Sequence, residues 1–242
     1  MGRGPSIAAR KGAEDARRGK LFTKFIREIT VAARTGGGDP RSDARLRLVL
    51  DKAFAANMPK DTAERAIKRG TGELGDAQYE EIRYEGYGPG GVAIMVDCMT
   101  DNPTRTVADV RHAFSKNGGN LGNSGSVAYL FAEIGQIFLD ASGDPTQDER
   151  VLEVALEAGA DDVISDDRYT EVLASPDAFE AVKNALTAKG FELLQADVTM
   201  RPATMVHVTG EQAESVARIV EMLEDLDDVQ KVYSNADLGD GS

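Results

Sequence analysis

The order of short segments between residues 134 and 200 constrains the fold more than any other feature of the sequence. Runs rich in β-branched and apolar residues alternate there with segments of helical periodicity, and turn residues separate them. The segments are a strand at 135–140, a helix at 147–158, strands at 162–165 and 169–174, a helix at 176–189 and a strand at 192–200. This β-α-β-β-α-β order predicts a ferredoxin-like domain.

The segments on either side of this unit predict a second α+β domain. Before it come a strand (79–87), a Gly-Pro-Gly-Gly turn, a buried strand (92–99), a helix that starts at Asn102-Pro103, a Gly- and Asn-rich loop (117–125) and a strand (126–131). After it come a strand (205–208), a helix (211–226) and a strand (229–233), too few to fold alone, so we expect them to complete the sheet that begins at Tyr79. The prediction is a discontinuous α+β domain, 79–131 and 202–242, with the ferredoxin-like domain, 132–201, inserted in it.

The first 78 residues predict a small helical domain. From residue 20 onward, apolar side chains recur on one side of a helix, and Gly36-Gly37-Gly38 ends it; the apolar residues are Phe22, Phe25, Ile26, Ile29 and Ala33. Two more helices are expected at 42–56 and 59–69. Residues 1–19 are basic and punctuated by glycine, which favours a mobile tail with a short helix after Ser6. The fold class is therefore α+β multidomain, with an N-terminal three-helix domain (1–78) and two α+β domains.

Charge is divided unevenly along the chain. Residues 1–72 carry 17 Lys and Arg against 8 Asp and Glu, a net charge of +9. The other 170 residues carry 11 against 33, a net charge of −22, so the overall value of −13 hides a basic segment. Such asymmetry indicates an anionic partner for the basic segment, and the acidic remainder would repel that partner.

Cations recur at helical spacing within the basic segment. Lys20, Lys24, Arg27 and Arg34 share one side of the first helix, and a second group shares one side of the next. Such rows can follow a line of phosphates and release counterions, although rows of charge are also commonly hydrated surface. The candidate nucleic-acid-binding residues are Arg10, Lys11, Arg17, Arg18, Lys20, Lys24, Arg27, Arg34, Arg41, Arg45, Lys52, Lys68 and Arg69. No recognition-helix motif is identifiable, so contact with phosphate and shape is expected rather than base reading.

Catalytic machinery is not evident in the sequence. The two histidines, His112 and His207, are 95 residues apart; His112 is expected to be a hydrated surface residue and His207, in a strand, a structural one. Cys98 lies among apolar residues and is expected to be a small buried side chain. We therefore expect a non-enzymatic protein with no catalytic residue.

Two kinds of loop in the sequence are candidate ligand sites. The acidic pairs Asp161-Asp162 and Asp166-Asp167 could hold Mg²⁺, but loop carboxylates are usually hydrated. The Gly-rich loops at 88–91 and 117–125 lack the residues of a P-loop or a dinucleotide site, so tight turns are favoured over phosphate binding. No metal and no cofactor are expected, and a metal- or ligand-dependent sensor or enzyme built on the ferredoxin-like domain is a remote alternative.

The sequence predicts a cytoplasmic location. It has a single cysteine, no apolar run that approaches the ~20 residues of a membrane span, and a polar start without a signal-peptide core. A membrane partner is therefore not expected.

Four long blocks of the sequence occur together in one known family. They are GKLFTKFIREITVAARTGGGDP (19–40), NMPKDTAERAIKRGTG (57–72), YEGYGPGGVAIMVD (84–97) and TDNPTRTVADVRHAFSKNGGNLG (100–122). In this order they resemble the YebC/PmpR family, which includes the mitochondrial translational activator of cytochrome c oxidase subunit I. The resemblance covers nearly the whole chain and implies a three-domain fold with the ferredoxin-like domain inserted. Many members begin with a segment like GHSKWANIKHRK; this chain begins GRGPSIAARK, which lacks the aromatic residue and the histidines but keeps Arg10 and Lys11.

The resemblance implies a regulator of gene expression that binds nucleic acid. Some members are described as DNA-binding transcriptional regulators, and others as translation factors that act at the ribosome, in some cases on proline-rich stretches. DNA is therefore the first expected partner, and rRNA or the ribosome is the alternative; the charge pattern fits both. The acidic domains are candidate sites for protein partners.

Overall fold

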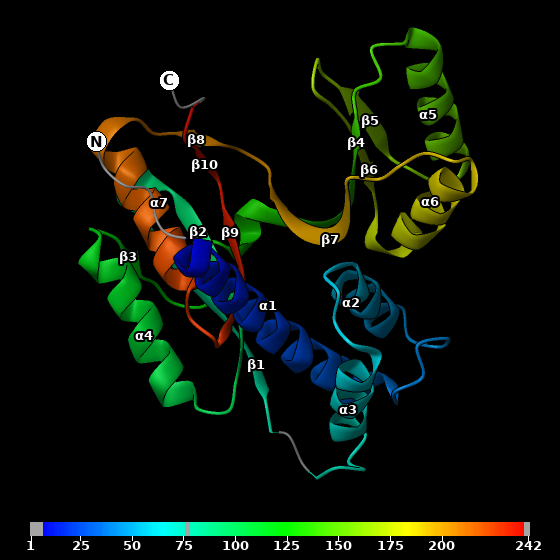
Figure 1. The fold of residues 1–242 in the computed structure, drawn as a ribbon. Helices are drawn as coiled ribbons and strands as arrows, with labels where there is room; N and C mark the ends of the chain where they lie inside the picture. Colours follow the sequence, from blue (N-terminus) through cyan, green and yellow to red (C-terminus); the bar gives the residue numbers. More distant parts are fainter. Residues whose placement is uncertain (1–6, 76–77, 240–242) are drawn as a thin grey trace. The chain divides into compact units, whose positions relative to one another are not determined.

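The α+β fold class is confirmed by the computed structural model, which describes residues 7–75 and 78–239, with side chains from residue 16 onward (Figure 1). The chain divides into two compact units, one made of Met1–Ala128 with Met205–Ser242 and the other of Tyr129–Thr204. The helical segment and the first sheet both belong to the first unit. The finer division of that unit into a helical domain and a discontinuous α+β domain therefore stays a prediction.

Three helices form the N-terminal part of the first unit: α1 (Ile7–Gly36), α2 (Ala44–Ala55) and α3 (Lys60–Gly70). The predicted apolar stripe of α1 is confirmed, because Ile29 and Ala33 are fully buried and Phe22, Phe25 and Ile26 pack against the same core. The core is completed from the other two helices by Leu46, Val49, Leu50, Ala53, Ala63 and Ala66. The glycine stop is also confirmed, since α1 ends at Gly36 and the next two residues have positive φ angles.

The N-terminal boundary of α1 differs from the prediction. Residues 7–19 continue the helix instead of forming a mobile tail with a short separate helix. The two glycines in this stretch suggested a break, but a glycine inside a helix costs only about 1 kcal/mol. Extending an existing helix avoids the unfavourable nucleation that a separate one would need, so propagation from the packed part of α1 is cheaper.

A four-stranded antiparallel sheet forms the rest of the first unit. Its strands are β1 (Glu80–Tyr87), β2 (Ala93–Thr100), β3 (Asn120–Leu121) and β9 (Val229–Ser234), in the order β3-β1-β2-β9. The short 3-10 turn η1 (Pro89–Gly91) joins β1 to β2, and β8 (Val206–His207) pairs in parallel with β10 (Ala236–Asp237). The prediction that the C-terminal segment completes this sheet is confirmed, because β9 pairs with β2.

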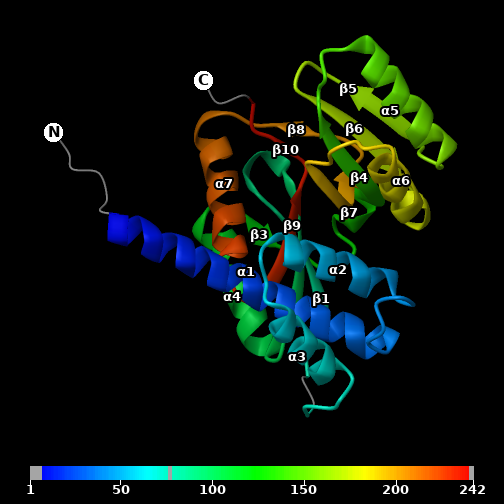
Figure 2. The same cartoon turned by 45° about the vertical axis from the view of Figure 1, so that its right-hand side comes forward.

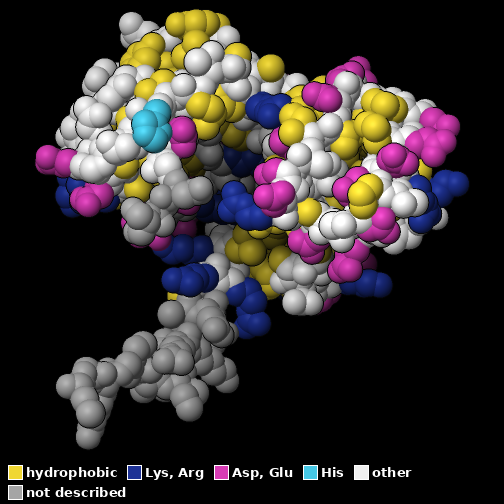
Figure 3. Space-filling model, turned by 90° about the horizontal axis from the view of Figure 1, so that it is seen from above, with side chains coloured by type: hydrophobic (Ala, Val, Ile, Leu, Met, Phe, Trp, Pro, Cys, Tyr) yellow, Lys and Arg dark blue, Asp and Glu magenta, His cyan; other side chains and the backbone are white. Residues whose placement is uncertain are grey.

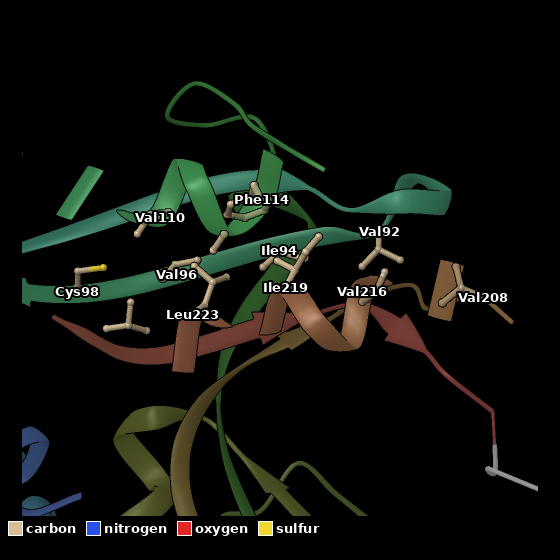
Figure 4. Packing of buried hydrophobic residues seen from close by; sticks show 12 residues of the cluster. Val92, Ile94, Val96, Cys98, Val110, Phe114, Val208, Val216, Ile219 and Leu223 are labelled. Atoms are coloured by element: carbon tan, nitrogen blue, oxygen red, sulfur yellow. The ribbon is translucent and has the colours of Figure 1, made fainter. Parts of the chain in front are cut away.

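Two helices pack on one face of this sheet, α4 (Pro103–Lys116) and α7 (Gly210–Glu224). Figure 4 shows Val92 and, from β2, Ile94, Val96 and Cys98 in one buried cluster with Phe114 of α4 and with Ile219 and Leu223 of α7. The start of α4 is the predicted one: the Asn102 side chain accepts a hydrogen bond from the amide of the third residue on.

The second unit has the predicted β-α-β-β-α-β order. Its elements are β4 (Phe131–Asp140), α5 (Pro145–Glu157), β5 (Asp162–Ser165), β6 (Tyr169–Ala174), α6 (Pro176–Ala188) and β7 (Gln195–Pro202). The strands form an antiparallel sheet in the order β5-β6-β4-β7. Figure 2 shows both helices on the same face of this sheet. The buried residues of the sheet and helices of this unit include Ile137, Val172, Phe179, Val182 and Leu186.

The strand expected at 126–131 is wrong. Residues Ala128–Leu130 form a short 3-10 turn, η2, and β4 begins only at Phe131 and runs unbroken for ten residues. The Glu85 carboxylate accepts hydrogen bonds from the amides of Gly125, Val127 and Ala128, at 2.6, 3.0 and 2.5 Å. These amides are thereby withdrawn from strand pairing, which explains the turn.

Candidate nucleic-acid interface

Helix α1 lies beside the C-terminal end of α7 in both views of the ribbon (Figure 1 and Figure 2), and cations of α1 contact that end. Lys20 forms an ion pair with Asp225, and Lys24 Nζ donates to the Glu224 carbonyl oxygen at 2.5 Å. The last carbonyls of a helix have no partner within it and carry the negative end of its dipole, so the two lysines satisfy the end of α7. Burial lowers the pKa of Lys24, and the nearby acidic groups of Glu224 and Asp227 oppose this shift.

Arg27, on the same side of α1, is nearly buried, with 12% of its side chain exposed. Its Nη1 donates to Asp228 Oδ1 at 2.7 Å and to the Met99 carbonyl oxygen at 2.8 Å. The guanidinium also lies 5.1 Å from the centre of the Tyr79 ring, a cation–π distance. Arg27 therefore joins α1 to the ends of β2 and β9. Its positive charge is paired with a carboxylate of the same protein.

Asp228 collects hydrogen bonds from two other side chains besides Arg27. Arg105 of α4 donates through Nη2 to Oδ1 at 2.9 Å and through Nε to Oδ2 at 3.1 Å, and Thr106 Oγ1 donates to Oδ2 at 2.9 Å. Burial alone would raise the pKa of Asp228, but the hydrogen bonds from Arg105, Arg27 and Thr106 outweigh it and hold the pKa below its ordinary value. The ionised carboxylate ties α1, α4 and the start of β9 together.

A second group of cations lies where α3 meets α1. Gly70, the last residue of α3, is so close to α1 that a Cβ on it would lie 3.1 Å from the Arg34 amide nitrogen. This contact places the end of α3 that carries Lys68 and Arg69, both exposed, next to Arg34. We refer to Arg34, Lys68 and Arg69 as the α1–α3 corner. Of these, Arg34 donates through Nη2 to the Tyr79 carbonyl oxygen at 2.8 Å.

The row predicted on the second helix is not continuous. Arg41 precedes α2 and bonds locally to Asp39, with Nη2 and Oδ2 2.9 Å apart. Arg45 lies within α2 and pairs with Glu81 at the start of β1, at 2.5 Å. Lys52, one turn from the end of α2, is half-buried. The structure thus gives these cations separate surroundings and does not bring them to the side of α1 that meets α7.

The remaining candidates lie toward the N-terminal end of α1. Arg17 and Arg18 are exposed. Arg10 and Lys11 lie on the same helix, but their side chains are outside the described residues. On the face drawn in Figure 3, Lys and Arg side chains gather near the point where the described side chains begin.

The histidines and the cysteine have the surroundings that the sequence suggested. His112 is exposed on α4, and His207 lies in β8, where its Nδ1 is 3.2 Å from Asp237 Oδ2. Cys98 is 2% exposed in the core of the first sheet, and burial raises the pKa of its thiol to about 12.

The Gly-rich loops and acidic pairs are occupied by local hydrogen bonds. The amide of Gly125, the last residue of the 117–125 loop, donates to the Glu85 carboxylate together with the amides of Val127 and Ala128, so the end of this loop binds an anion that belongs to the protein. Asp166 accepts from the amides of Arg168 and Tyr169 at 2.7 and 2.8 Å, which forms the turn before β6. Within residues 7–75 and 78–239, no group of three metal-binding side chains could hold an ion, and no helix has the length and apolar character to span a membrane.

Sequence reasoning missed the residues that surround Asp228. Arg105 and Thr106 were part of a predicted helix, and Asp228 preceded a predicted strand, but more than 120 residues separate them. Spacing within a helix or strand carries no information about contacts over that distance. No signal in the single sequence would have found this cluster.

These features define a class of α+β proteins in which a basic helical segment precedes more acidic α+β units. The chain belongs to the TACO1/YebC family, since residues 4–73 match the model described as "TACO1/YebC protein N-terminal domain" and residues 79–236 match "TACO1/YebC second and third domain". It is 58% identical over 241 residues to a "probable transcriptional regulatory protein" of Stenotrophomonas maltophilia, covering 99% of this chain and 98% of that one. A protein of the same description from Halorhodospira halophila is 61% identical over 234 residues, covering 96% and 94%.

One solved structure supports the fold. A conserved hypothetical protein of Aquifex aeolicus is 45% identical in sequence and superposes with a TM-score of 0.82. The match covers 94% of this chain and 93% of that one. The relatives' descriptions support a role in regulation, and the Aquifex protein supports the arrangement of helices and sheets.

Proposed function

We propose that the protein is a non-enzymatic, cytoplasmic regulator of gene expression that binds nucleic acid through its basic N-terminal helices, with duplex DNA as the first candidate. Support comes from the full-length relatives described as probable transcriptional regulatory proteins. The observation that carries the proposal is the set of exposed cations in a segment of net charge +9: Arg17 and Arg18 on α1, and the α1–α3 corner. Cations clustered on helices bind phosphate by releasing counterions.

Binding through phosphate and shape fits this segment better than base reading. Residues 1–72 contain one asparagine and no glutamine, and these two side chains are the usual readers of adenine. The centre of α1 is buried from Ile29 to Ala33, so this part of the helix is not available to enter a groove. We therefore expect affinity that varies little with sequence and strongly with salt.

Ribosomal RNA is the second candidate, and the same composition favours it. Double-stranded RNA is recognised mostly by shape and by backbone contacts, which require no base-reading side chains. The second unit carries 16 Asp and Glu against 5 Lys and Arg. We expect the second unit not to contact DNA or RNA, because like charges repel, and to be available to protein partners.

The test is binding of fluorescent 20-base-pair duplexes, DNA and RNA, followed by anisotropy between 50 and 200 mM KCl. Each phosphate contact adds about 0.9 to the salt slope, so each contact contributes an about 3.5-fold fall in affinity over this fourfold salt range. A variant that loses one contact should lack that factor. Lys68→Ala and Arg69→Ala should each weaken binding and lower the slope. Lys189→Ala, an exposed cation of the acidic unit, is the matched control and should change neither.

The outcomes separate the candidates. If neither duplex binds at 50 mM KCl, the proposal fails. If RNA binds at least tenfold more tightly than DNA at the same salt, ribosomal RNA replaces DNA as the target. A salt slope that Lys68→Ala and Arg69→Ala leave unchanged would remove the α1–α3 corner from the interface.

A further inference from the structure

The segment that meets α1 is the most acidic part of α7 and its following loop. Glu221, Glu224, Asp225, Asp227 and Asp228 fall within eight residues. Three of the four cations in the predicted α1 row contact this segment: Lys20 through Asp225, Lys24 through the Glu224 carbonyl and Arg27 through Asp228. We refer to residues 221–228 as the acidic α7 end.

The contacts are of the kind that a nucleic-acid backbone makes. Lys20 meets an ionised oxygen of the Asp225 side chain, and Lys24 meets a helix-terminal carbonyl oxygen that has no partner within α7. A phosphate offers the same lysines anionic oxygens at hydrogen-bond distance. The acidic α7 end therefore stands where a phosphate bound to this side of α1 would stand.

We propose that the acidic α7 end competes with nucleic-acid phosphate for Lys20 and Lys24, so that the fold itself limits binding by this side of α1. The inference rests on the proposed function, since it assumes that the basic helices bind nucleic acid. The acidic α7 end belongs to the same chain as the lysines and is therefore always present. A nucleic-acid phosphate comes from another molecule and must displace it.

Burial separates the contacts that can exchange from the one that cannot. The side chains of Lys20 and Asp225 are 45% and 73% exposed, so rotation of the lysine is enough to change its partner. Arg27 and Asp228 are 12% and 7% exposed and stay paired. The buried pair holds α1 against the sheet, so exposed Lys20 can exchange between Asp225 and phosphate without movement of the helix. Lys24 is half-buried, so phosphate must reach further in to replace its carbonyl partner.

The contacts made by the acidic α7 end are weak enough for a polyanion to displace, but a single small anion gains little by displacing them. An exposed ion pair contributes little in water and is screened by salt. A single small anion gains little by displacing it, whereas a duplex that already contacts neighbouring cations adds each further lysine with the release of a counterion. The acidic α7 end should therefore weaken short or sparse contacts more than extended ones.

The test is Asp225→Asn, which removes the competing charge and keeps every cation. Binding to the 20-base-pair DNA duplex at 50 mM KCl should become about two- to fivefold tighter, and the salt slope steeper by up to about 0.9. Glu214→Gln is the matched control: it removes one negative charge from α7, the helix that Asp225 follows, at a residue that pairs with Arg218 at 3.8 Å. In a Lys20→Ala background, Asp225→Asn should no longer tighten binding.

Each outcome decides between the ideas. Equal affinities for Asp225→Asn and Glu214→Gln would overturn the competition and leave the proposed function standing. An Asp225→Asn gain that persists in the Lys20→Ala background would also overturn it, because the effect would then be one of overall charge. If the wild-type protein and all variants fail to bind, the proposed function fails and the competition with it.

Discussion

Replacing Asp228 by Asn should destabilise the first unit more than any exposed charge replacement. The side chain keeps its size but loses its charge, so the nearly buried Arg27 is left without a counter-ion. Arg105 is less affected, because its Nη2 also contacts Asp101 at 3.0 Å and its side chain is 46% exposed. The damage is therefore concentrated on Arg27 and on the attachment of α1.

The expected loss is about 3 kcal/mol, at the lower end of the range for breaking one partner of a buried ion pair, since the amide oxygen of Asn still accepts one hydrogen bond. For a folding unit of this size, each kcal/mol lowers Tm by about 2–4 °C, so the transition of the first unit should fall by roughly 6–12 °C. Asp61→Asn is the control. It breaks an ion pair with Arg65 whose two side chains are 75% and 63% exposed, and it should cost less than about 1 kcal/mol.

Calorimetry measures the transition, and hydrogen exchange of peptides from α1 and α4 locates the loss. The reasoning is refuted if Asp228→Asn lowers Tm no more than Asp61→Asn, or if exchange rises elsewhere and not in these helices. The pH dependence gives a second check. The pKa of Asp228 is depressed in the folded state, so its contribution is present above the unfolded value of about 3.9 and is lost as pH falls through the folded one. Wild type and variant should differ by a constant amount above about pH 5 and converge in acid.

Three substitutions and one labelling experiment test the packing of the first unit. Gly70→Ala would place a Cβ 2.3 Å from the Thr30 carbonyl oxygen and should lower the free energy of unfolding by about 1–3 kcal/mol. Gly19→Ala, whose Cβ would have no atom within 4 Å, should instead stabilise α1 by about 0.5–1 kcal/mol. Equal Tm values for the two variants would contradict this. Glu85→Gln replaces a carboxylate that accepts three amide hydrogen bonds by an amide group, in which one of the two terminal atoms is a donor. The free energy of unfolding in urea should fall by about 1–3 kcal/mol, and a change near zero would contradict this. Cys98, whose pKa burial raises to about 12, should resist iodoacetamide at pH 8 until the protein is unfolded, and rapid labelling of the native protein would show that the thiol is accessible.

Much of the fold could be predicted from sequence patterns that span only a few neighbouring residues. The apolar stripe of α1, from Phe22 to Ala33, is a matter of helical spacing, and the start of α4 at Asn102 is a matter of one capping side chain. The order of segments in the second unit followed in the same way, because each strand and helix carries its own periodicity. These features are local, so the sequence alone was sufficient.

The boundary of α1 at residues 7–19 was missed for a local reason, whereas the other error arose where a distant residue decided a local conformation. The expected strand at 126–131 fails because Glu85, about 40 residues earlier, takes the amides that a strand would have paired. The same limit applied to the candidate site. The cations of α1 were correctly placed on one side of a helix, but Asp225 and Asp228, the partners of Lys20 and Arg27, lie about 200 residues later.

The sequence by itself determined that Lys20, Lys24 and Arg27 share one side of a helix with a buried stripe on another, because both follow from the residues per turn. It also determined that positive charge is concentrated in residues 1–72 and negative charge in the remainder. Only the tertiary structure decided what the cationic side meets, since the end of α7 reaches α1 through the packing of a sheet that joins strands from residues 80–121 to β9 at residues 229–234. Spacing sets the direction in which a side chain points, whereas long-range packing sets its surroundings.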